Sequence, residues 1–153
     1  MSDDREDERQ PELALVKFAR PAMSGLRGIT PLARTDILSV LLQTLAPGGR
    51  QGVHSHSAYE GFYFALSGRA RFYGRDNKFF AEIGPNEAVL VPRNTPYAFE
   101  AAGDKEVQLL AINVQDTGAV DDFKGYEPGA DIENYDLYAP DGTPRDLAEI
   151  KMQ

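Results

Sequence analysis

Apolar residues fall in short stretches along this chain, and turn-forming residues separate them. Gly-Pro-Asn at 84–86 and Ala-Pro-Gly-Gly at 46–49 are two such separators. Short apolar stretches at this spacing predict an all-β sandwich or barrel. Residues 37–45 are apolar enough for a helix, but a Pro-Gly turn follows and no cap precedes them, so we expect a buried strand. The stretches are Leu13–Phe18, Ile37–Leu45, Gly61–Leu66, Ala70–Tyr73, Lys78–Ile83, Ala88–Val91 and Val107–Val114.

The sequence predicts one folded domain with different ends. Its 153 residues suffice for one hydrophobic core. Residues 1–10 hold five acids and two bases, which predicts a disordered acidic tail. Residues 11–115 form the single β-barrel domain, and 116–153 form an irregular C-terminal extension rich in Gly, Pro and Asp. Within that extension, Arg145–Lys151 is predicted to be a short helix.

Composition and charge narrow the class of protein further. The net charge is −8, and it lies mainly in the two ends of the chain. Acidic ends repel phosphate groups, so we expect no nucleic-acid partner and no membrane partner. There is no Cys, hence no disulfide framework and no thiolate metal site. An acidic N-terminus without an apolar core is not a secretory signal, and a cytoplasmic location is expected.

The chain has two histidines, and they lie two positions apart. On a strand, alternate residues point to the same face, so His54 and His56 are expected to present both imidazoles together. Glu60 follows four residues later. Two imidazoles and a carboxylate suit a divalent metal ion, with Fe(II) favoured and Mn, Ni or Zn as alternatives.

These residues resemble the first motif of the cupin superfamily, with Pro-Gly-Gly at 47–49 before them and Gly68 after them. The segment at 84–99, Gly-Pro-Asn-Glu-Ala-Val-Leu-Val-Pro-Arg-Asn-Thr-Pro-Tyr-Ala-Phe, resembles the second motif. The resemblance implies a cupin-type double-stranded β-helix, a jelly-roll barrel, with metal near one end of its interior. Tyr-Glu-Gly-Phe-Tyr at 59–63 and Val-Pro-Arg-Asn-Thr at 91–95 are most similar to quercetinase-type flavonol-cleaving dioxygenases.

The sequence departs from the family pattern at several positions. Tyr97 stands where the second motif has a histidine ligand, so it is either a phenolate ligand or a neutral hydrogen-bonding group. Seven residues instead of six separate Glu60 from Gly68, and counting back from Gly68 places Gly61 at the ligand position. We expect a β-bulge near 58–61 to turn Glu60 inward. Asn86 and Asn94 replace glycines, and Asn tolerates the positive φ that such turns need.

Three functions remain open, each with a small-molecule substrate or ligand. The first is a metal-dependent dioxygenase acting on an enolisable or aromatic substrate, with His54, His56 and Glu60 on the metal. The resemblance implies that Glu60 is also the catalytic base and that Tyr97 is a catalytic proton donor or an additional ligand. The second is a metal-dependent isomerase or lyase that uses the same residues. The third is a cupin that binds a ligand without catalysis.

A homodimer is expected, because the apolar face of Leu13–Phe18 exceeds what one small barrel buries.

Overall fold

The computed structural model describes residues 11–116, 118–126 and 135–146. These residues form strands, with one short 3₁₀ helix, η2, at Arg75–Asn77. The expected all-β class is therefore confirmed. The strands are β1 Arg27–Arg34, β2 Leu38–Leu45, β3 Arg50–Ser55, β4 Tyr59–Ser67, β5 Ala70–Tyr73, β6 Phe79–Ile83, β7 Ala88–Val91, β8 Tyr97–Ala101, β9 Val107–Gln115, β10 Lys124–Gly125, β11 Asp136–Tyr138 and β12 Pro144–Arg145.

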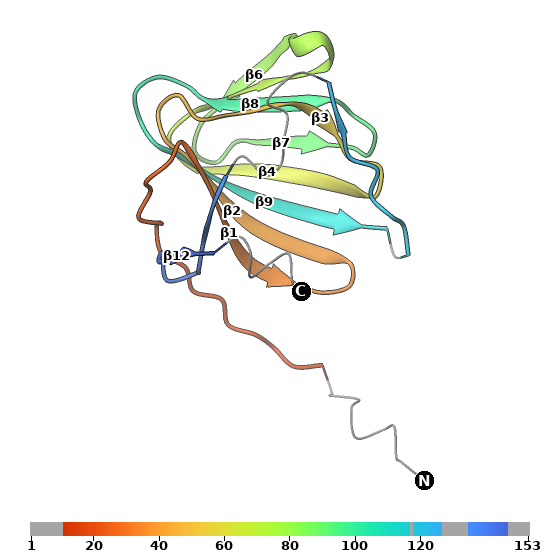
Figure 1. Ribbon diagram of the computed structural model, residues 1–153. Helices are drawn as coiled ribbons and strands as arrows, with labels where there is room; N and C mark the ends of the chain where they lie inside the picture. The colour runs from red at the N-terminus through yellow and green to blue at the C-terminus, as the bar shows by residue number, and fades with distance from the viewer. Residues whose placement is uncertain (1–10, 117, 127–134, 147–153) are drawn as a thin grey trace.

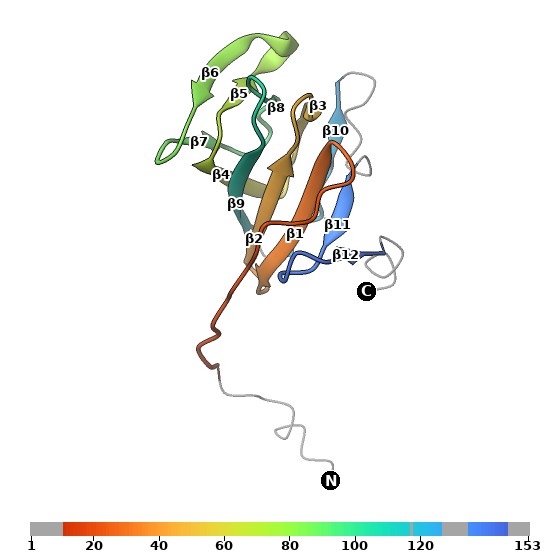
Figure 2. The ribbon, with the colours of Figure 1, turned by 90° about the vertical axis from the view of Figure 1, so that its left-hand side faces the viewer.

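Two sheets face each other and enclose the core (Figures 1 and 2). The larger sheet has the order β12-β11-β1-β2-β9-β4-β7, and the smaller one has the order β10-β3-β8-β5-β6. All pairings are antiparallel except that of β1 with β11. Sequence neighbours often lie in different sheets, as β2, β3 and β4 do, and this alternation is what the expected jelly-roll barrel requires.

Six of the predicted apolar stretches coincide with β2, β4, β5, β6, β7 and β9. The seventh, Leu13–Phe18, is not a strand, which corrects that expectation: its residues are exposed, and none of the described strands pairs with them. The C-terminal extension supplies β10, β11 and β12. In the predicted helix Arg145–Lys151, Arg145 belongs to β12, and residues 147–151 lie outside the described part of the chain, as does the tail 1–10.

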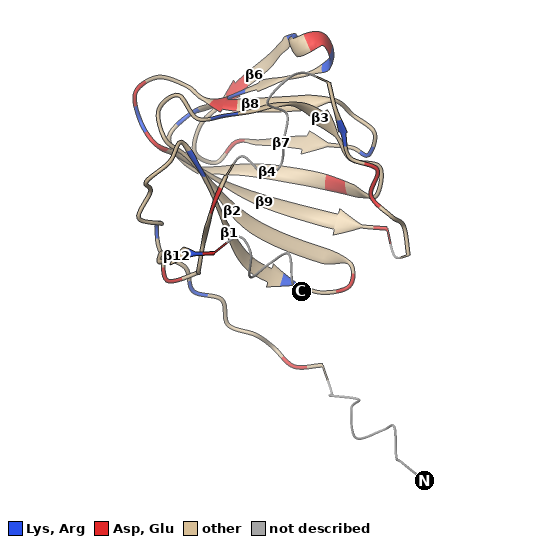
Figure 3. Ribbon diagram, in the orientation of Figure 1, with Lys and Arg blue, Asp and Glu red and all other residues tan. Residues whose placement is uncertain are grey.

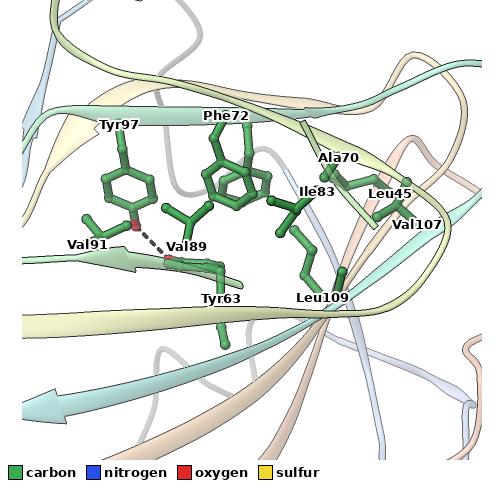
Figure 4. Packing of buried hydrophobic residues seen from close by; sticks show 13 residues of the cluster. Leu45, Tyr63, Ala70, Phe72, Ile83, Val89, Val91, Tyr97, Val107 and Leu109 are labelled. Atoms are coloured by element: carbon green, nitrogen blue, oxygen red, sulfur yellow. Dashed lines mark hydrogen bonds between the residues drawn. The ribbon is translucent and has the colours of Figure 1, made fainter. Parts of the chain in front are cut away.

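The core fills the space between the sheets (Figure 4). Every second residue of β4 faces it, so Gly61, Tyr63 and Ala65 are buried while Glu60 and Phe62 are exposed. Phe72 and Phe99 pack ring to ring at 5.6 Å between centroids and are almost fully buried. Charged residues lie mainly on loops and strand ends (Figure 3). The core cluster combines nine aliphatic side chains with four aromatic ones, Tyr63, Phe72, Tyr97 and Phe99.

Asn86 and Asn94 adopt φ of 71° and 60°. The expectation that asparagine would keep the glycine-type turn geometry is confirmed at both positions. The Asn94 turn is also tied to the histidine segment, because the Asn94 backbone N–H donates to the His56 carbonyl oxygen at 2.7 Å. The second motif thus holds the end of the first motif in place.

Candidate functional site

An irregularity in β3 decides which side chains of this strand face the barrel interior. Gln51 pairs with Phe99 and His54 pairs with Tyr97, so two residues separate the β3 partners where one separates the β8 partners. The extra residue is a β-bulge at 52–53. Because of it, His54 lies on the buried face beside Tyr97, at 4.2 Å between ring centroids.

His54 is fully buried and presents one ring nitrogen to the interior. Its Nδ1–H donates to the Gly52 carbonyl oxygen at 2.8 Å, which leaves Nε2 with a lone pair. That Nε2 has no hydrogen-bond partner within the described residues. Burial lowers the pKa of His54 to about 4, so the imidazole is neutral near pH 7.

The buried, neutral His54 predicts a loss of stability on mild acidification. The unfolded chain takes up a proton near the ordinary pKa of 6.5, but the folded chain takes it up only near pH 4. The free energy of unfolding should therefore fall by about 3 kcal/mol as the pH drops from 6.5 to 4. Urea titrations of chelator-treated protein across this range measure the slope. His54→Gln should flatten it, and an unchanged slope in that variant would contradict the assignment.

His56 lies between a carboxylate and a phenol. Its Nδ1–H donates to Asp121 Oδ2 at 2.7 Å, and its Nε2 accepts the Tyr59 hydroxyl proton at 2.9 Å. Its ring lies 5.1 Å from that of His54, so the structure brings the two predicted histidines together on the buried side. Burial lowers the pKa of His56, and Asp121 partly opposes that shift. A neutral His56 can accept a proton at Nε2 while Asp121 stabilises the resulting imidazolium.

Asp121 also fixes the backbone next to His56. Its Oδ1 accepts the Ser57 and Ala58 backbone N–H groups at 2.9 and 3.1 Å. Burial acts to raise the pKa of Asp121, but the hydrogen bonds from His56 and these amides outweigh it and lower the pKa. The carboxylate is thus ionised near neutral pH and orients the imidazole.

Tyr59 is held as a neutral phenol. Its ring stacks on His56 at 4.2 Å between centroids. Burial raises the pKa of the Tyr59 hydroxyl, and the nearby Tyr63 and Asp121 add to the shift. Tyr59 can therefore lose its proton only if His56 takes it at the same time.

The expected inward turn of Glu60 is corrected by the structure. The irregularity in β4 lies between Ala65 and Ser67, not near Ala58–Gly61, so the start of β4 keeps its ordinary alternation. Glu60 therefore points outward: 53% of its side chain is exposed, and its Oε1 lies 3.8 Å from Arg93 Nε. Glu60 is the one acidic residue of β4, and it is the red segment of that strand in Figure 3. Gly61 faces inward instead, as the count back from Gly68 suggested.

Tyr97 faces the interior, as expected, and donates or accepts a 2.6 Å hydrogen bond with the Tyr63 hydroxyl (Figure 4). Burial raises the pKa of Tyr97 well above its ordinary value, and Tyr63 raises it further. Of the two roles left open for Tyr97, the neutral hydrogen-bonding group is the one that this environment favours.

The donor atoms do not fit a cupin metal ion. Glu60 is outside, Gly61 brings no ligand, Tyr97 is a neutral phenol, and Tyr59 occupies His56 Nε2. His54 Nε2 is the remaining available donor of the predicted set. Within the described residues, no three His, Cys, Asp or Glu side chains come together in a metal-binding group. A divalent ion of this type needs about three protein ligands.

Two hollows meet at Tyr59 and Asn113. The inner one, beside His56 and Tyr97, has a volume of about 10 Å³, room for about one water molecule. The outer one, about 180 Å³, opens beneath the β1–β2 turn and is bordered by Arg34 and Ser39. We call it the mouth pocket. Asn113 Oδ1 is buried without a hydrogen-bond partner within the described residues, and it lies beside Gly61, which lines the inner hollow.

Two residues of this site were missed from the sequence. Asp121 lies 65 residues from His56, within the C-terminal extension that was predicted to be irregular, and no motif marks it there. Tyr59 is part of the Tyr-Glu-Gly-Phe-Tyr segment at 59–63 that resembles the first motif. Its hydrogen bond to His56 follows only from the fold.

Comparisons with known proteins agree with the fold. A family model described as a cupin domain matches residues 41–113. A conserved protein with a double-stranded β-helix domain from Klebsiella pneumoniae superposes with a TM-score of 0.61 at 15% identity, covering 72% of this chain and 86% of that chain. The cupin domain of Cnp3 from Schizosaccharomyces pombe gives 0.54 at 17% identity, covering 58% and 64%. No protein with a curated description matches the sequence.

Residues 41–113 therefore match a cupin domain, and the chain has the cupin fold. DMSP lyase DddQ from Ruegeria pomeroyi is a further structural neighbour, with a TM-score of 0.50 at 24% identity, covering 60% of this chain and 45% of that chain. The chain spans less than two thirds of the Cnp3 domain and of DddQ. At these identities the likeness concerns the fold, which hosts many functions. In the described segments, no helix has the length and apolarity needed to cross a membrane.

Proposed function

We propose that this chain is a small-molecule cupin enzyme that moves protons without redox chemistry, as isomerases and lyases do. The observation that carries the proposal is the hydrogen-bonded series Asp121–His56–Tyr59, whose last residue lines both the inner hollow and the mouth pocket. A carboxylate, an imidazole and a hydroxyl in this order form an acid–base relay. The dioxygenase function stays a prediction that the donor atoms do not support.

The proposed step is a proton transfer from carbon. The Tyr59 oxygen takes a proton from a C–H next to a substrate carbonyl, while the Tyr59 hydroxyl proton passes to His56 Nε2. Asp121 balances the positive charge on the imidazole. The carbanion either returns the proton at another atom, giving an isomer, or expels a leaving group, giving an elimination product.

The mouth pocket limits the substrate class. Its volume of about 180 Å³ lies below the range of about 300–1,000 Å³ typical of drug-sized ligands. Arg34 borders it and is exposed, so it can meet an anion. A small oxo acid, with a carbonyl for the chemistry and a carboxylate for Arg34, satisfies both features.

Proton exchange in D₂O tests the proposal whichever product the enzyme forms. Untagged, chelator-treated protein is incubated with a panel of small 2-oxo and 3-oxo acids, and ¹H NMR follows the C–H signals next to each carbonyl. We expect one or more acids to lose these signals faster than in buffer. If the chelated protein is inert and iron restores activity together with oxygen uptake, the proposal is wrong and the dioxygenase is right.

A non-catalytic ligand-binding cupin is the second candidate, and the closed interior is the observation that favours it. The inner hollow of about 10 Å³ leaves no room for a substrate beside His56 and Tyr97. In the same NMR panel, a binding protein would show saturation transfer to an oxo acid but no loss of its C–H signal.

A further inference from the structure

The side chain of Arg27 carries a positive charge into the barrel. Arg27 lies on β1, and 4% of its surface is exposed. Of the buried polar side chains in the described segments, it is the one that is charged near neutral pH, and no carboxylate of these segments forms an ion pair with it. Burial lowers the pKa of Arg27, but a guanidinium stays protonated near neutral pH. A buried charge is costly unless an anion balances it.

The N–H groups of this guanidinium are only partly used. Arg27 Nε donates to Gln43 Oε1 at 3.3 Å, and within the described residues Gln43 is the one group that accepts from it. Arg27 Cζ lies 6.0 Å from the centre of the Phe99 ring and 5.5 Å from that of the Tyr135 ring. Contacts with ring faces leave N–H groups in the guanidinium plane free, and these groups match the two oxygens of a carboxylate.

Two buried acceptors on the same side of the core also lack a partner. Gln51 of β3 pairs with Phe99 of β8, so both side chains leave the same face of the smaller sheet and point into the core. Gln51 Oε1 and His54 Nε2 have no hydrogen-bond partner in the described part of the chain. The Arg27 charge acts on His54, because it lowers the pKa of His54 in addition to the larger effect of burial. Buried polar atoms without a protein partner are typical of places where a ligand, an ion or water binds.

We propose that the guanidinium of Arg27 binds a small carboxylate anion inside the barrel. The carboxylate accepts two N–H groups of Arg27 and supplies the counter-charge. A hydroxyl group on the same anion can donate to Gln51 Oε1 or His54 Nε2, so a hydroxy acid fits better than an unsubstituted acid. The core around Phe99 is closely packed, which limits the occupant to the smallest acids, such as acetate and glycolate. The site is distinct from the mouth pocket, so the inference does not depend on the proposed function.

Isothermal titration calorimetry with acetate, glycolate and benzoate at constant ionic strength tests the site. Glycolate should bind about fivefold more tightly than acetate, the usual effect of one additional hydrogen bond. Benzoate, whose ring is too large for the packed interior, should not bind. Benzoate binding as tight as that of acetate would overturn the inference, because it would indicate attraction to exposed cations. Equal affinity for acetate and glycolate, or no binding of either acid, would overturn it as well.

Two variants neutralise the interior in different ways. Arg27→Met removes the charge, and Gln43→Glu supplies a carboxylate at the position that already accepts from Arg27 Nε. Each should weaken glycolate binding by about tenfold or more, the usual loss for a charged hydrogen bond. Arg71→Met, at an exposed arginine of the smaller sheet, is the matched control and should leave the binding unchanged. Loss of binding in Arg34→Met with full binding in Arg27→Met would place the anion at the mouth pocket and overturn the inference.

The melting temperatures of these variants give a second readout. In buffer without carboxylates, Arg27→Met and Gln43→Glu should each keep or raise the melting temperature, because each removes the unbalanced charge. Glycolate should raise it in the unsubstituted protein and in Arg71→Met, but not in these two variants. Gln43→Glu hardly changes the shape of the side chain, so it decides the question if Arg27→Met does not fold. A clear fall of the melting temperature in Gln43→Glu would show that Arg27 is already balanced, and would overturn the inference.

Discussion

We expect Tyr59→Phe to lower the rate of proton exchange at the substrate carbon by about 10²- to 10⁴-fold, the usual contribution of a positioned general base. The phenyl ring keeps its stacking on His56 and loses only the hydroxyl that bonds to Nε2. Substrate affinity should change little, because the lost interaction matters in the transition state. The measurement is kcat and KM by ¹H NMR for the oxo acid found in the panel.

Three comparison variants make this prediction specific. Tyr73→Phe removes a phenol that bonds to Glu100 away from the site, and it should leave the rate unchanged. Asp121→Asn weakens acceptance of the His56 Nδ1–H and should slow the reaction nearly as much as Tyr59→Phe. Glu60→Gln separates the two mechanisms: a large loss there with none in Tyr59→Phe would show that the carboxylate of the first motif is the base.

The pH dependence of the rate follows from the environment of His56. The relay needs neutral His56, and burial lowers the pKa of His56 below its ordinary value of 6.5. The rate should therefore persist at pH 6.5 and decline only at more acidic pH. A decline centred above 6.5 would show that another group controls the reaction.

The apolar pattern predicted the strands that contain alternating or continuous hydrophobic residues, and it failed where polar residues are buried. β1 contains Arg27 and Thr30, which are 4% and 0% exposed, so its pattern does not look apolar. The Arg27 guanidinium lies over the Phe99 ring at 6.0 Å and donates to Gln43, which lets a strand of mixed polarity face the core. Contacts of this kind arise from tertiary structure and leave no periodic signal.

The site shows a similar limit. The spacing of His54 and His56 was sufficient to place them together, but the orientation of Glu60 depended on where β4 accommodates one extra residue. A bulge at 58–61 and one at 65–67 have the same length in sequence and opposite effects on Glu60. The relay needed Asp121, which the fold brings from 65 residues away.

Phe99→Ala should lower the free energy of unfolding by about 3–5 kcal/mol, the cost of a large cavity in a packed core. Phe99 is fully buried, and its ring lies 5.5 Å from Tyr63 and 5.6 Å from Phe72 between centroids. Urea unfolding at fixed protein concentration measures the change. Phe80→Ala, at a phenylalanine that is 66% exposed, is the control and should cost less than about 0.5 kcal/mol.

The same variant separates the role of the interior from that of the mouth pocket. Phe99 packs beside Tyr97, at 6.3 Å between ring centroids, whereas Tyr59 and Asn113 line the mouth pocket. If the chemistry takes place in the mouth pocket, Phe99→Ala should keep most of its kcat under conditions where it is folded, despite the large loss of stability. A loss of kcat as large as that of Tyr59→Phe would instead place the reacting atoms in the barrel interior, next to His54 and Tyr97.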